Sequence, residues 1–229
     1  MSNPRIALIA EGPMDALLIE AALKAVLRGP FILSTLQPSP TRPEFGGGWC
    51  GVFKWCREIA KRGVADLETD TTLPGFDLFI VHVDADVANA SYADGGAAVE
   101  EASLHMPPLP CTSECPPAVT AVDAIRARIH AWLGFTSLGP KTVLCVPSKA
   151  PEAWLVSAVL DATHPLQKHV ECNLRLETAL ANLPKGIRIK KSAVQYREHT
   201  SKLTENWARV TAACTQAARF EDEIRAVFP

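Results

Sequence analysis

Short apolar blocks alternate with longer amphipathic blocks through about the first 160 residues of the chain. The short blocks are rich in Leu, Ile and Val and predict buried strands, whereas the longer blocks repeat apolar positions at helical spacing. The expected strands are residues 5–10, 30–36, the apolar run within 77–86, and 141–146, and the expected helices are residues 13–28, 49–62, 97–105, 119–133 and 151–160. This order predicts an α/β fold with a parallel sheet flanked by helices.

The pattern becomes polar and amphipathic in the last part of the chain and predicts further helices, with breaks at 184–186 and around 190–199. A chain of 229 residues is long enough for one large domain with a helical appendage. We therefore expect an α/β domain over residues 1–165, with a loop insertion at about 87–117. A mainly helical extension over residues 166–229 is expected to pack on the same domain.

The apolar run within residues 77–86 ends in two carboxylates, Asp84 and Asp86. Side chains alternate along a strand, so both should project the same way if the extended conformation persists through Ala85. Two like charges repel, and a cation between them would relieve the repulsion. A turn after a strand, where Asp binds its own backbone, is the simpler structural alternative.

Other acids follow the neighbouring strands. Glu11 follows the first expected strand, Asp15 lies one helical turn further on, and Glu152 follows the fourth strand. Carboxylates are the ligands that Mg²⁺ prefers, and the carboxyl edge of an open α/β sheet is where ligands bind. The sequence thus predicts a Mg²⁺ or Mn²⁺ site of these five acids for phosphoryl transfer. Glu11, Asp15 and Glu152 could instead be acids that favour a helix N-terminus.

The arrangement Glu11-Gly12-x-x-Asp15 followed by Asp84-x-Asp86 resembles the Toprim domain of primases, topoisomerases and overcoming-lysogenization-defect (OLD) nucleases. The segment Val146-Pro147 with Glu152-Ala153-Trp154-Leu155 resembles small stand-alone Toprim-like proteins related to the OLD and RloB groups. This resemblance implies a Toprim-like, Rossmann-like sheet and metal-dependent nuclease chemistry. Glu11, Asp84, Asp86 and Glu152 would be catalytic.

The resemblance also implies a bacterial or phage setting, with defence as one role, and allows for a partner protein such as an ATPase subunit. The chain departs from the general pattern in its insertion between Val87 and Pro117 and in Tyr196-Arg197, where tyrosine followed by lysine is expected. The insertion leaves the geometry of any DNA complex open, and the second departure leaves the catalytic lysine unassigned.

A net charge of -2 provides no overall basic field for nucleic acid. Contact would have to come from local cations, and we expect it from Lys149, Arg188, Lys190 and Lys191. Each of these could also be an ordinary solvated surface charge. Trp154 and Leu155 are expected in the core.

The composition, with 48% hydrophobic and 21% charged residues, is typical of soluble globular proteins. The first residues show no signal-peptide pattern, and no apolar segment is long enough to cross a membrane. The seven irregularly spaced cysteines predict buried or loop thiols rather than disulfides, and only Cys111 and Cys115 have the spacing of a zinc pair. Cytoplasmic localisation without membrane association is the simplest expectation.

Two other functions fit the same motifs. A glycosyltransferase also holds Mn²⁺ with a DxD motif after an apolar strand, but it would have no use for Glu11. A binding or regulatory subunit could keep the fold without catalysis, and in that case Asp84 and Asp86 would be dispensable. The sequence leaves the choice between DNA and RNA and the oligomeric state open.

Overall fold

The computed structural model describes residues 3–112 and 114–229 and contains a four-stranded sheet in the order β2-β1-β3-β4. The strands are β1 Arg5–Ile9, β2 Ile32–Gln37, β3 Leu78–His82 and β4 Thr142–Cys145. Every neighbouring pair is parallel. The predicted α/β class, with a parallel sheet flanked by helices, is confirmed.

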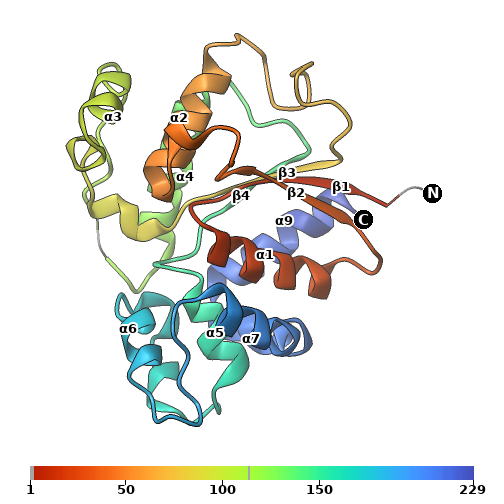
Figure 1. The fold of residues 1–229 in the computed structure, drawn as a ribbon, viewed down its shortest axis with the longest axis vertical. Coiled ribbons are helices and arrows are strands. Elements are labelled where there is room, and N and C mark those ends of the chain that lie inside the picture. The colour runs from red at the N-terminus through yellow and green to blue at the C-terminus, as the bar shows by residue number, and fades with distance from the viewer. Residues whose placement is uncertain (1–2, 113) are drawn as a thin grey trace.

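The sheet lies between two layers of helices (Figure 1). One layer contains α2 Gly48–Ala60, α3 Ala97–Ala102 and α4 Val119–Leu133, and the other contains α1 Pro13–Val26, α5 Glu152–Val159, α6 Leu176–Ala181, α7 Ala193–Glu205, α8 Trp207–Ala213 and α9 Thr215–Val227. Short 3₁₀ helices connect them: η1 Pro43–Phe45, η2 Ala85–Asn89, η3 Tyr92–Gly95, η4 Pro165–Gln167 and η5 Val170–Cys172.

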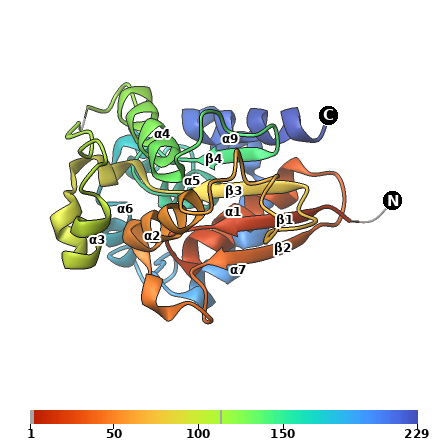
Figure 2. The same ribbon diagram turned by 90° about the horizontal axis from the view of Figure 1, so that it is seen from above.

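The central strands read as continuous apolar runs because both of their faces are covered. In β1, Ile6 and Leu8 join the core beneath α1, whereas Ala7 and Ile9 join the core beneath α2 and α4. Figure 2 shows the same layers from above, with both termini at the amino end of the strands. The carboxyl edge of the sheet therefore lies at the other end of the molecule, where α3 and α6 are found.

The C-terminal helices complete the core on the α1 side of the sheet. Tyr196 and Leu203 of α7 are buried there together with Trp154 and Leu155 of α5, which confirms the prediction for the last two. The predicted break around residues 190–199 is wrong over most of its length, because α7 begins at Ala193. The Ser192 side chain caps this helix by accepting a hydrogen bond from the backbone of Gln195, and such a cap stabilises a helix start.

In the insertion, the predicted helix at 97–105 forms but ends at Ala102. In the described part of the chain, no helix has the length and apolar character needed to cross a bilayer.

Candidate acidic site at the carboxyl edge of the sheet

Glu11 links the ends of two adjacent strands. Its Oε1 accepts a hydrogen bond of 2.8 Å from the backbone N–H of Asp84, across a separation of 73 residues. Gly12 and Pro13 then start α1, as predicted, with Pro13 in its first turn. Burial, and next the negative charge of Asp84, raise the pKa of Glu11 from 4.5 to about 8. The site therefore disfavours the ionised form of this carboxyl group.

Asp84 is the centre of the acidic cluster. Burial, followed by the charges of Asp15, Asp86 and Glu152, holds its pKa well above the usual range. Its Oδ1 lies 3.1 Å from Nε2 of the fully buried His82. The pair has the separation of an ion pair but not the geometry of a hydrogen bond, so both atoms lack a hydrogen-bond partner among the residues described. Buried polar atoms without a hydrogen-bond partner are rare in folded proteins, and a bound cation is one explanation for this oxygen.

Asp86 lies at the outer side of the cluster. β3 ends at His82, and the chain turns into η2 at Ala85, so the extended conformation through Ala85, the condition for both aspartates to project the same way, is not present. Asp86 belongs to the first turn of η2, and its side chain is exposed. The surrounding protein still removes enough water to raise its pKa, although Lys149 opposes the rise. The two aspartates thus differ in depth, because the backbone is helical rather than extended between them.

Asp15 faces the same cluster from α1. Asp15 is only 7% exposed, and its pKa is raised, mainly by burial and also by Glu152. A Cβ atom at Gly12 would lie 3.2 Å from Asp15 Oδ2, so a larger residue at this turn would crowd the carboxylate. Asp15 is therefore part of the acidic site and is not a solvated helix residue.

Glu152 begins α5 and is almost completely buried, at 1% exposure. Its Oε1 accepts a hydrogen bond of 2.8 Å from the Tyr196 hydroxyl and lies 3.3 Å from Lys191 Nζ. Lys191 also pairs with Glu177 at 3.0 Å. Burial lowers the pKa of Lys191, but Glu152 and Glu177 raise it to a larger extent, so the lysine stays charged. Among the described residues, Glu152 thus has a lysine within ion-pair distance, whereas neither Glu11 nor Asp84 pairs with a Lys or Arg.

The predicted cations divide into two groups. Lys149 is buried and acts electrostatically on Asp86, and Lys191 contacts Glu152. Arg188 and Lys190 are exposed, and in the residues that the structure describes neither forms an ion pair with the acids. The structure brings together the five predicted acids, Lys149 and Lys191, and it leaves Arg188 and Lys190 on the adjoining surface.

The donor set fits a hard divalent cation in its chemistry, since it consists of carboxylates with unrelieved charge. Within residues 3–112 and 114–229, however, no three His, Cys, Asp or Glu side chains are arranged as a finished metal cage, for Mg²⁺ or for zinc.

The cysteine prediction is wrong for two residues, because Cys115 and Cys172 form a disulfide. Cys111 and Cys115 have the spacing of a zinc pair, but Cys115 is not free to bind a metal, because it is bonded to Cys172. The remaining five cysteines are free thiols, of which Cys56, Cys145 and Cys214 are buried as expected. Sequence spacing could not reveal the pairing, because the two half-cystines are 57 residues apart.

Two residues of the site escaped the sequence interpretation. His82 is a polar residue within an otherwise apolar strand, two positions before Asp84, and this contrast is a signal that could have identified it. Tyr196 is named only in the Tyr196-Arg197 segment of the resemblance, and its contact with Glu152 was not expected, because only the packing of α7 brings its hydroxyl to that residue.

Comparisons with known proteins identify no relative: no protein-family model matches this chain, and no curated protein or solved structure is significantly similar to it.

Proposed function

We propose that this protein is a Toprim-like, divalent-metal-dependent nuclease that hydrolyses phosphodiester bonds in DNA or RNA. The observation that carries the proposal is the cluster of Glu11, Asp15, Asp84 and Asp86, whose pKa values are all raised. A folded protein that forces four carboxyl groups together has negative charge to neutralise, and a bound divalent cation would do so. The order of the motifs, Glu11 before the DxD pair, adds the Toprim resemblance to this argument.

In this proposal Glu11, Asp84 and Asp86 hold Mg²⁺ or Mn²⁺, and Asp15 and Glu152 complete the set. The bound cation would polarise the phosphate and lower the pKa of a water molecule. Glu152 would orient the attacking water or hold a second cation, because Tyr196 and Lys191 fix its position. Lys191 and Lys149 would neutralise the charge that develops on the phosphate in the transition state.

The segment that follows α5 supports a nucleic-acid substrate. Six cations and two acids lie between residues 168 and 191, in a chain whose net charge is -2. The cations are Lys168, Arg175, Lys185, Arg188, Lys190 and Lys191, and the acids are Glu171 and Glu177. We propose that Arg188 and Lys190 contact the phosphate backbone beside the acidic site.

A direct test is to titrate the purified protein with Mg²⁺ and Mn²⁺ and to follow cleavage of labelled single- and double-stranded DNA and RNA. We expect metal-dependent cleavage of at least one substrate, and its loss in Glu11→Ala. Glu20→Gln is the matched control, because Glu20 lies on α1 like Asp15 but pairs with Lys24 on the exposed side. The proposal is contradicted if the protein binds neither metal and cleaves none of the four substrates.

A second candidate is a non-catalytic binding or regulatory subunit, which would keep the fold without using the acids in catalysis. A double variant, Asp84→Ala with Asp86→Ala, separates the two: it would retain biological activity as a regulatory subunit and lose it as a nuclease. A glycosyltransferase, in turn, would tolerate Glu11→Ala.

A further inference from the structure

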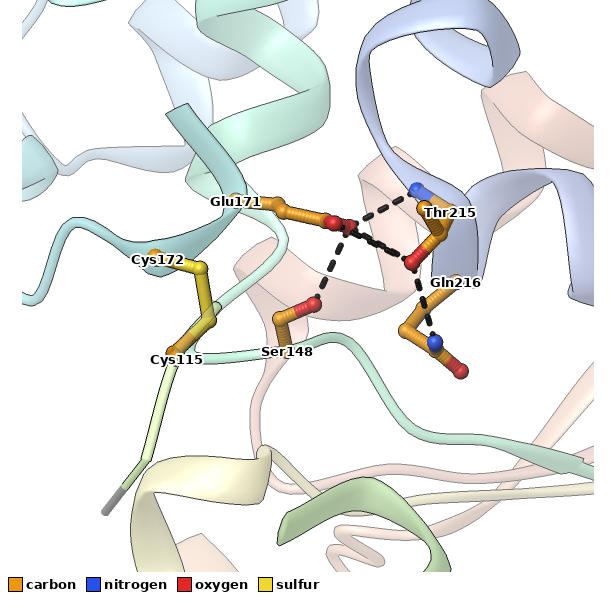
Figure 3. Close-up of a disulfide and its surroundings, with 6 residues drawn as sticks. All are labelled: Cys115, Ser148, Glu171, Cys172, Thr215 and Gln216. Carbon is orange, nitrogen blue, oxygen red and sulfur yellow. Dashed lines mark hydrogen bonds between the residues drawn. A yellow bond between two sulfur atoms is a disulfide. The ribbon is translucent and has the colours of Figure 1, made fainter. Parts of the chain in front are cut away.

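A disulfide between Cys115 and Cys172 connects segments from the two layers of the molecule. Their Cα atoms are 5.4 Å apart (Figure 3). Leu109, in the loop before Cys115, is buried in the core of the α2 and α4 layer, whereas Val170, just before Cys172, is buried in the core of the α1 layer. The covalent link therefore joins the two layers beside the chain segment that leaves β4.

On the Cys172 side, the neighbouring Glu171 organises that segment. Its Oε2 accepts hydrogen bonds from the Ser148 hydroxyl at 3.1 Å and from the Thr215 backbone N–H at 2.7 Å (Figure 3). Ser148 lies between Pro147, whose carbonyl accepts a 3.0 Å hydrogen bond from Ala85 N–H, and Lys149. Ala85 separates Asp84 from Asp86, so the contacts run from the disulfide to the middle of the DxD motif.

On the Cys115 side, a second set of contacts reaches the same motif. The backbone N–H of Cys111 donates a 2.7 Å hydrogen bond to the carbonyl of Ala88, in the 3₁₀ helix that carries Asp86. Nε of Arg128, in α4, donates a 2.6 Å hydrogen bond to the Pro108 carbonyl and so attaches the same loop to α4. The loop that precedes Cys115 is therefore hydrogen-bonded, at Cys111, to the 3₁₀ helix that carries Asp86.

We propose that Cys115–Cys172 is a thiol–disulfide exchange site for a dithiol reductant, and that its reduction loosens the acidic site. Both cysteines are half-buried, so a reductant can approach them. A thiolate of the reductant attacks one sulfur and forms a mixed disulfide, and the other cysteine leaves as a thiolate. The second thiol of the reductant then displaces the first cysteine. Two electrons and two protons pass to the protein, and the reductant becomes a disulfide.

Reduction removes a crosslink that closes a loop of 57 residues, and long loops gain most from closure. The hydrogen bonds of Glu171 would remain possible but would no longer be held by a covalent bond. We expect reduction to increase opening around Ala85 and Thr215 and to weaken Mn²⁺ binding about tenfold. The effect on metal binding rests on the function proposed above, whereas the effect on opening does not.

The test compares the oxidised wild type, the same protein reduced with dithiothreitol, and a Cys115→Ser, Cys172→Ser variant. Thiol titration of the denatured chain should find five free thiols before reduction and all seven afterwards. Hydrogen exchange should be about tenfold faster at the amides of Ala85 and Thr215 in the reduced protein and in the variant. Cys111→Ser is the matched control, because Cys111 lies in the same loop, is exposed and has a free thiol.

Seven free thiols in protein equilibrated with oxidised glutathione would overturn the proposal. Equal hydrogen-exchange rates at Ala85 and Thr215 in the oxidised and reduced states would overturn it as well. Equal Mn²⁺ affinity in the two states would overturn the coupling to the acidic site. A further outcome is that neither redox state binds Mn²⁺ while reduction still accelerates hydrogen exchange at Ala85 and Thr215. In that case the proposed nuclease function fails, and the proposed thiol–disulfide exchange site stands. The two failures are therefore distinguishable.

Discussion

The acidic site has two halves, one around Glu11 and Asp84 and one around Glu152, and the carboxyl groups of the two halves have different surroundings. Around Glu11 and Asp84, carboxyl groups are crowded and partly dehydrated, and their pKa values rise. Around Glu152, the carboxylate is the more deeply buried, yet it has the Tyr196 hydroxyl and the Lys191 ammonium as partners. Burial alone therefore does not explain the unrelieved charge. What distinguishes the first half is that no Lys or Arg among the described residues forms an ion pair with Glu11 or Asp84, and we propose that a metal ion supplies the counter-charge.

The largest effect is expected from removing the acid at the centre of the unpaired half. Asp84→Asn should reduce metal-dependent cleavage at least about a thousandfold, because it removes a ligand charge. It should also raise the stability of the metal-free protein, since one repelling charge is lost. Cleavage rates at saturating Mn²⁺ and thermal unfolding in the presence of a chelator measure the two effects. Unchanged cleavage would refute the role of Asp84.

The comparison also predicts how stability depends on pH. The pKa of Glu11 is 4.5 in the unfolded chain and about 8 in the folded one, so the unfolded state releases its proton first as pH rises. The folded state is therefore stabilised by its tighter binding of the Glu11 proton. This stabilisation is complete below about pH 4.5 and is lost progressively up to about pH 8. Asp15, Asp84 and Asp86 act in the same direction.

Metal-free wild type should therefore lose about 5 °C or more of Tm relative to Glu11→Gln between pH 5 and pH 8. Calorimetric scans of both proteins across this range provide the measurement. Mg²⁺ should restore the wild-type Tm at pH 8 and have little effect at pH 5. Parallel profiles of Tm against pH for the two proteins would show that folding does not raise the pKa of Glu11.

A smaller effect is expected in the paired half. Tyr196→Phe removes the hydroxyl that donates to Glu152 but leaves Lys191 in place, and it should cost about 1–3 kcal/mol of unfolding free energy. Cleavage should fall about tenfold, because Glu152 is less well positioned. Urea unfolding and kcat measure these changes. A variant as stable as the wild type would mean that the hydrogen bond contributes little.

The smallest effect concerns the cations outside the acidic cluster. Arg188→Ala with Lys190→Ala should weaken nucleic-acid binding several-fold. The slope of log K against log salt concentration should become smaller in magnitude by about 2, one for each lost phosphate contact. Metal affinity should not change, because neither residue pairs with the acids in the described chain. Titrations at several salt concentrations test this, and an unchanged slope would exclude the phosphate contacts.

The sequence by itself determined the sheet and the location of the acids. Short apolar runs that alternate with amphipathic helical segments are typical of buried parallel strands, and the carboxyl ends of parallel strands meet at one edge. Glu11, Asp84 and Glu152 were therefore expected at the same edge, and the structure brings them together there. Local pattern carries this information because strand and helix periods depend on neighbours a few residues apart.

Only the tertiary structure decided how each acid is balanced. The strand order places β1 beside β3, and this puts Glu11 against the Asp84 backbone. The turn into η2 at Ala85 separates Asp84 and Asp86 in depth, and the packing of α7 brings Tyr196 to Glu152. The Cys115–Cys172 pairing likewise depends on two distant loops meeting. These features depend on contacts between residues far apart in the chain, so no local periodicity encodes them.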